Sequence, residues 1–261
     1  MITLRASSIS DFFDCAARAE AKHLLGLRTP TSSKALLGTA VHASTAVYDR
    51  STIDQAGITA DEAAAAAVDV LQRPNEDVIW DESAQDIEPI ALALHHKYCT
   101  TIAPKQDYAA VEVACEELII SDLAIALTGT TDRVYRSGEG YGIADLKTGK
   151  TAVNAEGQCK TAGHAFQIGV YELLAQQGSG LPMTEPGQII GLQTGKTDKA
   201  QRIAIGEISG ARDVLLGDGE SPGVLEMVAN MVHSGVFPGN PRSMLCSEKY
   251  CPIHHRCKFR K

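Results

Sequence analysis

A change in the hydrophobic pattern near residue 108 limits what this chain can fold into. Over 108–120 and 123–135, β-branched and apolar residues alternate with polar ones, which is typical of strands. A third such stretch, 141–147, follows a glycine-containing turn, so the three together predict an antiparallel meander. A length of 261 residues is enough to bury one α/β core around these strands.

Helical patterns surround the meander. The first helix is expected to begin at Ser8 or Ser10 and to carry Cys15. Thr59 is expected to cap a helix that contains five consecutive alanines. We predict helices over 8–26, 34–48, 60–71, 86–101, 156–176 and 210–234, and a strand hairpin over 188–194 and 201–208.

Composition favours a cytoplasmic protein. The apolar fraction of 44% and the charged fraction of 21% are ordinary for a soluble globular chain. The first residues lack the basic and then apolar pattern of a signal peptide, and no apolar run approaches the length of a membrane span. We therefore expect no membrane partner.

The net charge of −8 is unevenly distributed. Residues 51–90 hold ten Asp or Glu and a single basic residue, Arg73, whereas residues 242–261 hold six Lys or Arg against Glu248 alone. A polyanion could therefore contact the basic end while the acidic segment faces elsewhere. Short basic tails are also common solubilising segments, so the tail supports nucleic-acid binding only weakly.

The most informative polar residues lie on the second and third strands of the meander. Asp132 is in the second strand, and Asp145 and Lys147 share one face of the third because they are two residues apart. Carboxylate oxygens are the ligands that Mg²⁺ prefers, and a nearby lysine can offset charge on a phosphate. The spacing alone fits a metal cleft and a decorated surface hairpin about equally well.

Three of the seven cysteines cluster near the C-terminus, at Cys246, Cys251 and Cys257. Such density points to metal ligation rather than to disulfides. An iron–sulfur cluster usually requires four thiolates, and Cys15 is the candidate for the fourth. A zinc site that uses His254 or His255 with the three clustered cysteines is the alternative, and the spacing does not separate the two.

Two further features are weak when taken alone. Gln167 and Tyr171 are four residues apart on a predicted helix and therefore share one face. His42 follows the small residues Gly38, Thr39 and Ala40, which would allow a close approach to another element. An ordinary half-buried helix explains each of these features equally well.

In their order along the chain, these features resemble a known family. Ser8 and Ser10 ahead of Cys15, Gly38-x-x-Val-His42, Gly129-Thr-Thr-Asp-Arg133, Asp145-Leu-Lys-Thr148, Gln167-x-x-x-Tyr171 and the three C-terminal cysteines follow one another. This series is similar to the RecB-like branch of the PD-(D/E)XK nuclease superfamily. The nearest pattern is that of the iron–sulfur exonucleases, including CRISPR-associated RecB-like nucleases, AddB nuclease domains and phage homologues.

The resemblance implies a fold and a domain organisation. It implies an α/β, restriction-endonuclease-like core with a mixed central sheet flanked by helices. An N-terminal helical elaboration and a C-terminal iron–sulfur-bound segment would be added to that core. In one RecB-like nuclease domain over 1–261, residues 50–105 would form a helical acidic insertion, 106–208 the nuclease core, and 237–261 with Cys15 the cluster module.

The resemblance also implies roles for individual residues. His42, Asp132 and Asp145 would be metal ligands for Mg²⁺ or Mn²⁺, with Leu146 contributing its carbonyl oxygen. Lys147 would be the catalytic lysine, and Gln167 and Tyr171 would position a DNA strand. Cys15, Cys246, Cys251 and Cys257 would hold a [4Fe–4S] cluster.

The implied activity is a metal-dependent DNA exonuclease acting on single-stranded or resected ends in recombination or repair, of phage or mobile-element type. A single-strand annealing protein, or another recombination protein, would be a candidate partner. The alternative is a non-catalytic iron–sulfur subunit that binds DNA in a recombination or CRISPR-adaptation complex.

Overall fold

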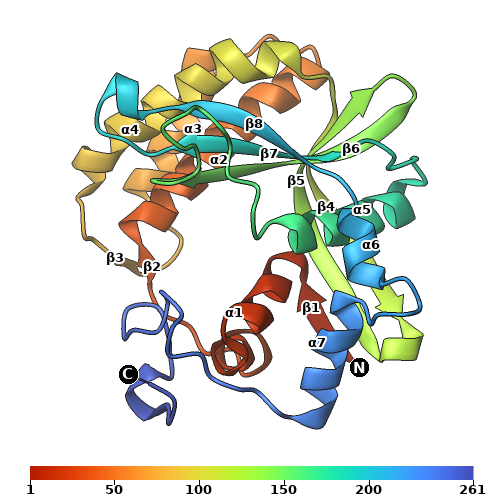
Figure 1. Cartoon of the computed structure of the whole chain (residues 1–261). Coiled ribbons are helices and arrows are strands. Elements are labelled where there is room, and N and C mark those ends of the chain that lie inside the picture. The colour runs from red at the N-terminus through yellow and green to blue at the C-terminus, as the bar shows by residue number, and fades with distance from the viewer. Residues whose placement is uncertain (261) are drawn as a thin grey trace.

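A mixed six-stranded sheet forms the centre of the molecule in the computed structural model, which describes residues 1–260 (Figure 1). Lys261, part of the expected basic tail and cluster module, lies outside the described residues. The strands of this sheet are β1 (Ile2–Arg5), β4 (Tyr108–Ile120), β5 (Ile125–Ser137), β6 (Gly140–Gly149), β7 (Gly187–Gln193) and β8 (Ile203–Ile208). A separate parallel pair is formed by β2 (Thr31–Ser32) and β3 (Val78–Ile79).

The central strand β5 has different partners along its length. One edge of β5 pairs with β4, antiparallel, almost from end to end. On the other edge, β1 pairs in parallel with residues Ile125 to Thr128, and β6 pairs antiparallel with residues Arg133 to Ser137. Between these two stretches β6 leaves β5 and continues beside β7. The sheet therefore opens into a fork at residues 129–132 of β5.

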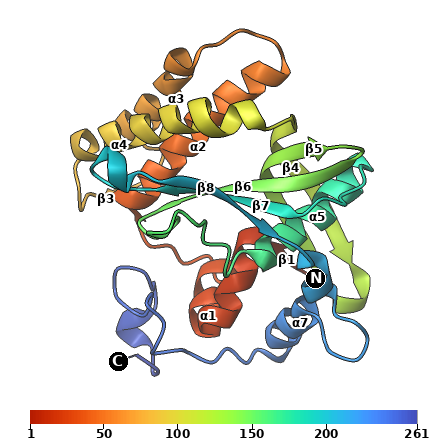
Figure 2. The same cartoon turned by 45° about the horizontal axis from the view of Figure 1, so that its top comes forward.

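Helices cover both faces of the sheet, as Figure 2 shows. On one face α1 (Ile9–Ala19), α5 (Ala165–Ser179), α6 (Ala211–Leu216) and α7 (Val224–Ser234) share a hydrophobic core with β1, β5 and β7. On the other face α2 (Ser33–Ile53), α3 (Ala60–Gln72) and α4 (Ala84–Lys97) form a second core with β6 and β7. None of the helices in residues 1–260 combines the length and apolar character that a membrane crossing requires.

Short helical turns connect these elements. The 3₁₀ turns are Ala6–Ser8, Ala103–Lys105, Ser121–Leu123, Asp198–Ala200 and His254–Arg256, and the π-helical turns are Glu20–Leu24 and Tyr98–Ile102. Local capping explains where several helices begin. Thr59 and Glu62 form a reciprocal capping box at the start of α3, as the sequence predicted for Thr59, and Ser83 with Asp86 does the same for α4.

Two predicted helices differ from those observed. The helix expected over 156–176 begins only at Ala165, because residues 150–164 form a loop in which Gly157 and Gly163 have φ values of +80° and +88°. The helix expected over 210–234 is two helices, α6 and α7. Gly217, at φ +75°, separates them, and Pro222 follows in the connecting loop. The antiparallel meander and the β7–β8 hairpin are confirmed.

The first helix is interrupted where the sequence predicted continuous helix. Cys15 has extended backbone angles, φ −158° and ψ 98°, inside α1. The backbone amides and carbonyls near this kink bond to the C-terminal segment instead. Ala17 N–H donates to the Pro238 carbonyl, and the Asn240 side chain donates to the Asp14 carbonyl at 2.8 Å. The kink therefore joins α1 to the C-terminal segment.

A buried ion pair attaches α2 to the sheet next to the fork. Arg133 Nε lies 2.6 Å from Asp49 Oδ2, and both side chains are 1% exposed. Arg133 also donates to Thr45 Oγ1, and the Tyr98 hydroxyl donates to Asp49 at 2.6 Å. Because Arg133 directly follows Asp132, this network fixes α2 at a set position relative to the fork.

Replacing Asp49 with Asn should destabilise the protein strongly. The guanidinium of Arg133 would stay buried without a counter-charge, which costs about 3–5 kcal/mol of unfolding free energy. Urea unfolding measures the change. The matched control is Asp69→Asn, which removes the exposed Arg73–Asp69 pair (side chains 81% and 64% exposed) and should cost about 1 kcal/mol or less. Equal losses in the two variants would contradict the structural role of the buried pair.

Candidate active site

Two carboxylates meet at the fork between β5 and β6. The last paired residues there are Arg133 and Ala144, so Asp132 and Asp145 are the next residues on the two diverging strands. The Leu146 amide donates to Asp132 Oδ2 at 2.8 Å and bridges the opening. The Leu146 side chain points into the core under α2, as its place in the alternation predicted. The two acidic groups are therefore held by backbone geometry.

Asp145 is the most enclosed group of the site. Its side chain is 1% exposed, and Lys147 Nζ lies 2.5 Å from its Oδ2 atom. Gln167, on α5, donates from Nε2 to Asp145 Oδ1 at 3.3 Å and to the Tyr171 hydroxyl at 3.0 Å. The Gln–Tyr pair predicted from four-residue spacing thus packs on the same carboxylate that Lys147 faces.

His42 reaches the fork from α2, on the opposite side of the sheet from α5. Its Nδ1 atom lies 3.4 Å from Asp132 Oδ2, and its side chain is 29% exposed. The sequence-predicted residues of the cleft are thereby gathered at one place. They are His42, Asp132, Asp145, Leu146, Lys147, Gln167 and Tyr171.

The two carboxylates have opposite electrostatic settings. Burial raises the pKa of Asp145 to about 6, and the Asp132 charge adds to this while Lys147 opposes it. Burial also acts to raise the pKa of Asp132, but His42, Lys147 and the Leu146 amide together outweigh it and hold that pKa below its ordinary value. Burial disfavours the charged imidazole of His42, yet Asp132 raises its pKa. The site is therefore a set of two carboxyl groups, one imidazole and one ammonium whose charges influence one another.

The donor set of the cleft fits a hard divalent cation. Oδ2 of Asp145 is buried and accepts no hydrogen bond with good geometry, although the Lys147 ammonium stands beside it. The Lys147 ammonium therefore shows that a positive charge is favourable beside Asp145 Oδ2. As the side chains stand, residues 1–260 contain no group of three or more His, Cys, Asp or Glu arranged to hold a metal ion. Asp132, Asp145 and His42 would have to move closer together around one.

Two glycines allow the surrounding elements to approach the fork closely. A Cβ atom on Gly38 of α2 would lie 2.6 Å from Thr148 Oγ1, the residue after Lys147. A Cβ on Gly129 of β5 would lie 2.8 Å from Cε1 of Tyr171. Both distances are shorter than real contacts, so only glycine fits without a shift. The small residues ahead of His42 thus do permit a close approach, and the partner is β6.

The four cysteines expected to act together line one small pocket. Cys15 comes from the kink in α1, and Cys246, Cys251 and Cys257 come from the C-terminal segment. Burial raises the pKa of Cys251, and the neighbouring Cys15 and Cys257 raise it further. The Asn240 amide donates to Cys15 Sγ at 3.3 Å. The kink at Cys15 is what turns this residue toward the other end of the chain.

His254 keeps the zinc alternative open. It lines the cysteine pocket, and its Nδ1 atom is buried without a hydrogen bond, whereas His255 is exposed. The other three cysteines lie elsewhere. Cys99 contacts His95 inside the α2–α4 core, Cys159 donates to the Ile189 carbonyl at 3.2 Å, and Cys115 is on β4. Of these three, only Cys99 is buried, whereas Cys115 and Cys159 are partly exposed.

Sequence reasoning missed residues that support the cleft from a distance. His164 is the N-cap of α5, and burial together with the charge of Lys147 lowers its pKa to about 4. Asp49 and Arg133 hold α2 against the sheet. A signal for Asp49 was present, because it lies seven residues after His42 and so on the same face of a helix.

A mixed sheet between two layers of helices, with carboxylates at its fork, is the arrangement of a restriction-endonuclease-like core. The family model of the PD-(D/E)XK nuclease superfamily matches residues 3–258, and the chain belongs to that superfamily. A solved structure described as the crystal structure of SSO0001 is similar at a TM-score of 0.42 and 14% identity, over 99% of this chain and 87% of the other. No curated protein matches the chain.

The raised pKa of Asp145 predicts a pH-dependent cost in the absence of divalent cations. Between its unfolded value near 3.8 and its folded value of about 6, the folded state binds more protons, so stability falls as pH rises through that window. Asp145→Asn removes this dependence. In EDTA, the unfolding free energies of wild type and Asp145→Asn should separate by up to about 3 kcal/mol between pH 4 and pH 7, with the wild type losing.

Urea unfolding at several pH values measures this difference. His42 and Asp132 are present in both proteins, so the comparison measures the effect of removing the Asp145 carboxyl, including its influence on the His42 pKa. Parallel stability curves across the whole range would show that Asp145 is not a perturbed carboxyl.

Proposed function

We propose that this protein is a metal-dependent DNA exonuclease. The superfamily implies a nuclease, and nucleases of this superfamily usually use Mg²⁺ or Mn²⁺. The observation that carries the proposal is the convergence of His42, Asp132, Asp145 and Lys147 at the fork of the sheet. The burial of the Asp145 carboxylate beside Lys147 and the Gln167 amide is not expected in an ordinary surface hairpin, whose acidic side chains are usually solvated.

In this proposal, different side chains of the cleft have different roles in phosphodiester hydrolysis. Asp132, Asp145 and His42, with the Leu146 carbonyl, would hold the metal, which when bound activates a water and offsets negative charge. Lys147, released from Asp145, places an ammonium where charge develops on the phosphate oxygens. Gln167 and Tyr171 form a polar edge beside Asp145 that orients the scissile strand.

Substrate preference is the finer part of the proposal. We propose single-stranded or resected DNA ends as substrate, in recombination or repair of a phage or mobile-element type. A single-strand annealing protein is a fitting partner because it would act on the strand that such an enzyme exposes or trims. The support is the order of motifs shared with iron–sulfur exonucleases.

We also propose that the cysteine pocket holds a [4Fe–4S] cluster. Four thiols from both ends of the chain line one pocket, which matches the ligand number that such clusters require. The role would be structural, because the hydrogen bonds that join the C-terminal segment to α1 near the pocket, within the part of the chain that the structure describes, are few and come from residues 238–243. Binding of the cluster would then contribute directly to folding free energy.

Cleavage assays test the enzyme proposal. Wild type with Mn²⁺ should degrade labelled linear single-stranded DNA, and Asp145→Asn or Lys147→Ala should lower kcat by about 100-fold or more. Asp107→Asn, which breaks an exposed pair with Arg136 outside the cleft, should leave the rate unchanged. Wild-type activity no higher than that of the cleft variants would favour the non-catalytic DNA-binding alternative.

Substrate ends distinguish the modes of cleavage. Circular single-stranded DNA should resist the enzyme, and linear strands blocked at the 5′ or the 3′ end should show which end is attacked. Cutting of circles at the rate of linear strands would overturn the exonuclease assignment and leave the nuclease assignment in place.

Metal analysis tests the cluster proposal independently of activity. Protein purified without oxygen should be brown and contain iron and sulfide, and Cys251→Ser should lose both and unfold at lower denaturant concentration. Cys159→Ser, a half-buried cysteine outside the pocket, should retain them. A colourless protein with one zinc per chain would contradict the cluster proposal and indicate a zinc site that includes His254.

A further inference from the structure

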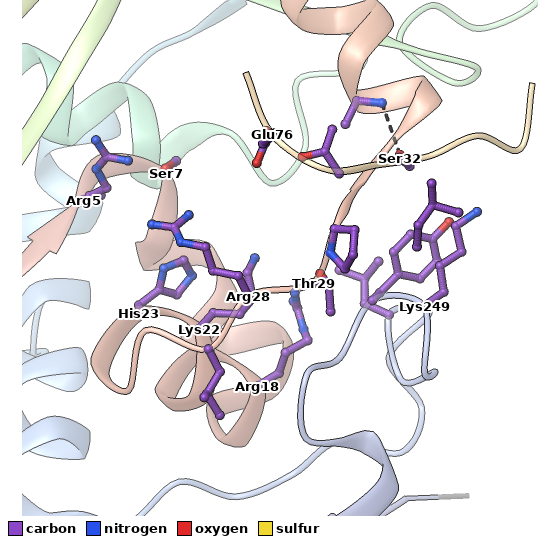
Figure 3. A pocket seen from close by; sticks show the side chains of 17 residues that line it. Arg5, Ser7, Arg18, Lys22, His23, Arg28, Thr29, Ser32, Glu76 and Lys249 are labelled. Atoms are coloured by element: carbon purple, nitrogen blue, oxygen red, sulfur yellow. Dashed lines mark hydrogen bonds between the residues drawn. The ribbon is translucent and has the colours of Figure 1, made fainter. Parts of the chain in front are cut away.

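A second, larger cavity lies between the first helix, the start of α2 and the C-terminal segment. Its volume is about 500 Å³. Figure 3 shows Arg5, His23 and Arg28 on one side of this cavity and Lys249 on the other. The basic residues of its lining are Arg5, Arg18, Lys22, His23, Arg28 and Lys249, against the single carboxylic acid Glu76. We call this cavity the basic pocket.

The charge of the basic pocket contrasts with the net charge of −8 of the chain. Some of its cations are already neutralised: Arg18 and Lys22 pair with Asp11, and Lys249 pairs with Asp81. Arg5 and Arg28 are different. Both side chains are exposed, and neither makes an ion pair or a side-chain hydrogen bond within residues 1–260. Two free guanidinium groups therefore face one cavity.

The uncharged lining suits phosphate groups and nucleobases. Ser7, Thr29, Thr31 and Ser32 supply hydroxyl groups, which commonly contact phosphate oxygens. Tyr250 is 39% exposed, and Lys249 Nζ lies 5.5 Å from the centroid of its ring. Guanidinium groups that follow a backbone, together with an aromatic ring for stacking, are the elements of single-strand binding sites.

The position of the basic pocket links it to the fork. Ala35 lines the pocket, and His42 lies seven residues later on the same face of α2, about 10 Å along the helix axis. Ser7, another lining residue, belongs to the turn Ala6–Ser8, whose Ala6 packs beside Gly129 and Tyr171 near the fork. A strand of a few nucleotides would reach from the pocket to the carboxylates.

We propose that the basic pocket binds the phosphate backbone of the single-stranded DNA whose end is presented at the fork, with Arg5 and Arg28 as its principal contacts. This inference rests on the proposed function and adds the path by which the substrate enters. Arg18 connects this path to the cysteine pocket. It lines both cavities, and it bonds to Asp14, which also accepts from Ser243 of the C-terminal segment at 2.7 Å.

A binding experiment on the full chain tests the proposal without cleavage. Fluorescence anisotropy in EDTA would measure the affinity for fluorescein-labelled oligothymidylate at several salt concentrations. The double variant Arg5→Gln/Arg28→Gln should bind about tenfold or more weakly at low salt. The slope of log K against log salt should fall in magnitude by about 1.4, since each lost contact to a single strand removes about 0.7.

The matched control removes the same charge elsewhere. Lys105→Gln/Arg136→Gln changes two exposed cations outside the pocket lining and should retain wild-type affinity and slope. Because all four side chains are exposed, unfolding midpoints should stay close to that of wild type. Equal losses in both double variants, or no loss in the pocket variant, would overturn the proposal.

Three further outcomes distinguish this proposal from the proposed nuclease function and from binding of an acidic protein segment. If wild type shows no cleavage but its DNA binding depends on Arg5 and Arg28, the nuclease assignment is wrong and the assignment of the basic pocket as a DNA-binding site stands. If the Arg5→Gln/Arg28→Gln variant cleaves and binds DNA as well as wild type does, the nuclease assignment stands and the basic pocket is not the binding site. If the pocket variant instead loses affinity only for a labelled polyglutamate peptide, the occupant is an acidic protein segment and the proposal is wrong.

Discussion

The buried pair between Arg133 and Asp49 is the interaction on which the geometry of this molecule depends. A charged pair at 1% exposure is favourable only when its geometry and hydrogen bonds are good, and here Thr45 and Tyr98 complete the set. Because Asp132 precedes Arg133 and His42 lies two helical turns before Asp49, one contact sets both sides of the fork. The fork in turn sets the carboxylates at the splayed end of β6.

Burial, rather than any single contact, gives the fork its chemical character. Asp145 is surrounded on one face by α5 and shielded on the other by the core under α2, so its ionised form depends on Lys147 or on another cation. Asp132 is partly exposed (19%) beside His42, and its lowered pKa means that it stays ionised more easily. Two aspartates thirteen residues apart in sequence therefore meet in different environments within one cleft.

Local patterns predicted what local physics determines. Alternation located the meander and the shared face of Asp145 and Lys147, and Thr59 located the start of α3. The late start of α5 and the kink at Cys15 were missed because each depends on contacts with distant segments. The Asp49–Arg133 pair joins residues 84 apart in sequence, and no periodicity signals such a contact. The basic pocket likewise combines residues from both ends of the chain, so composition alone indicated only the C-terminal part of its charge.

The attachment of the C-terminal segment to α1 has a consequence for how the protein is made. The hydrogen bonds that join Asp14 to Asn240 and Ser243 span 226 and 229 residues, the longest separations among the side-chain hydrogen bonds of the described chain. Contacts of this kind form late, because the intervening chain must be ordered before its ends can meet. During synthesis the fork can therefore form before the cysteine pocket is complete and before Lys249 and Tyr250 line the basic pocket. The cysteine pocket is thus completed only after the segment that follows α7 has been synthesised.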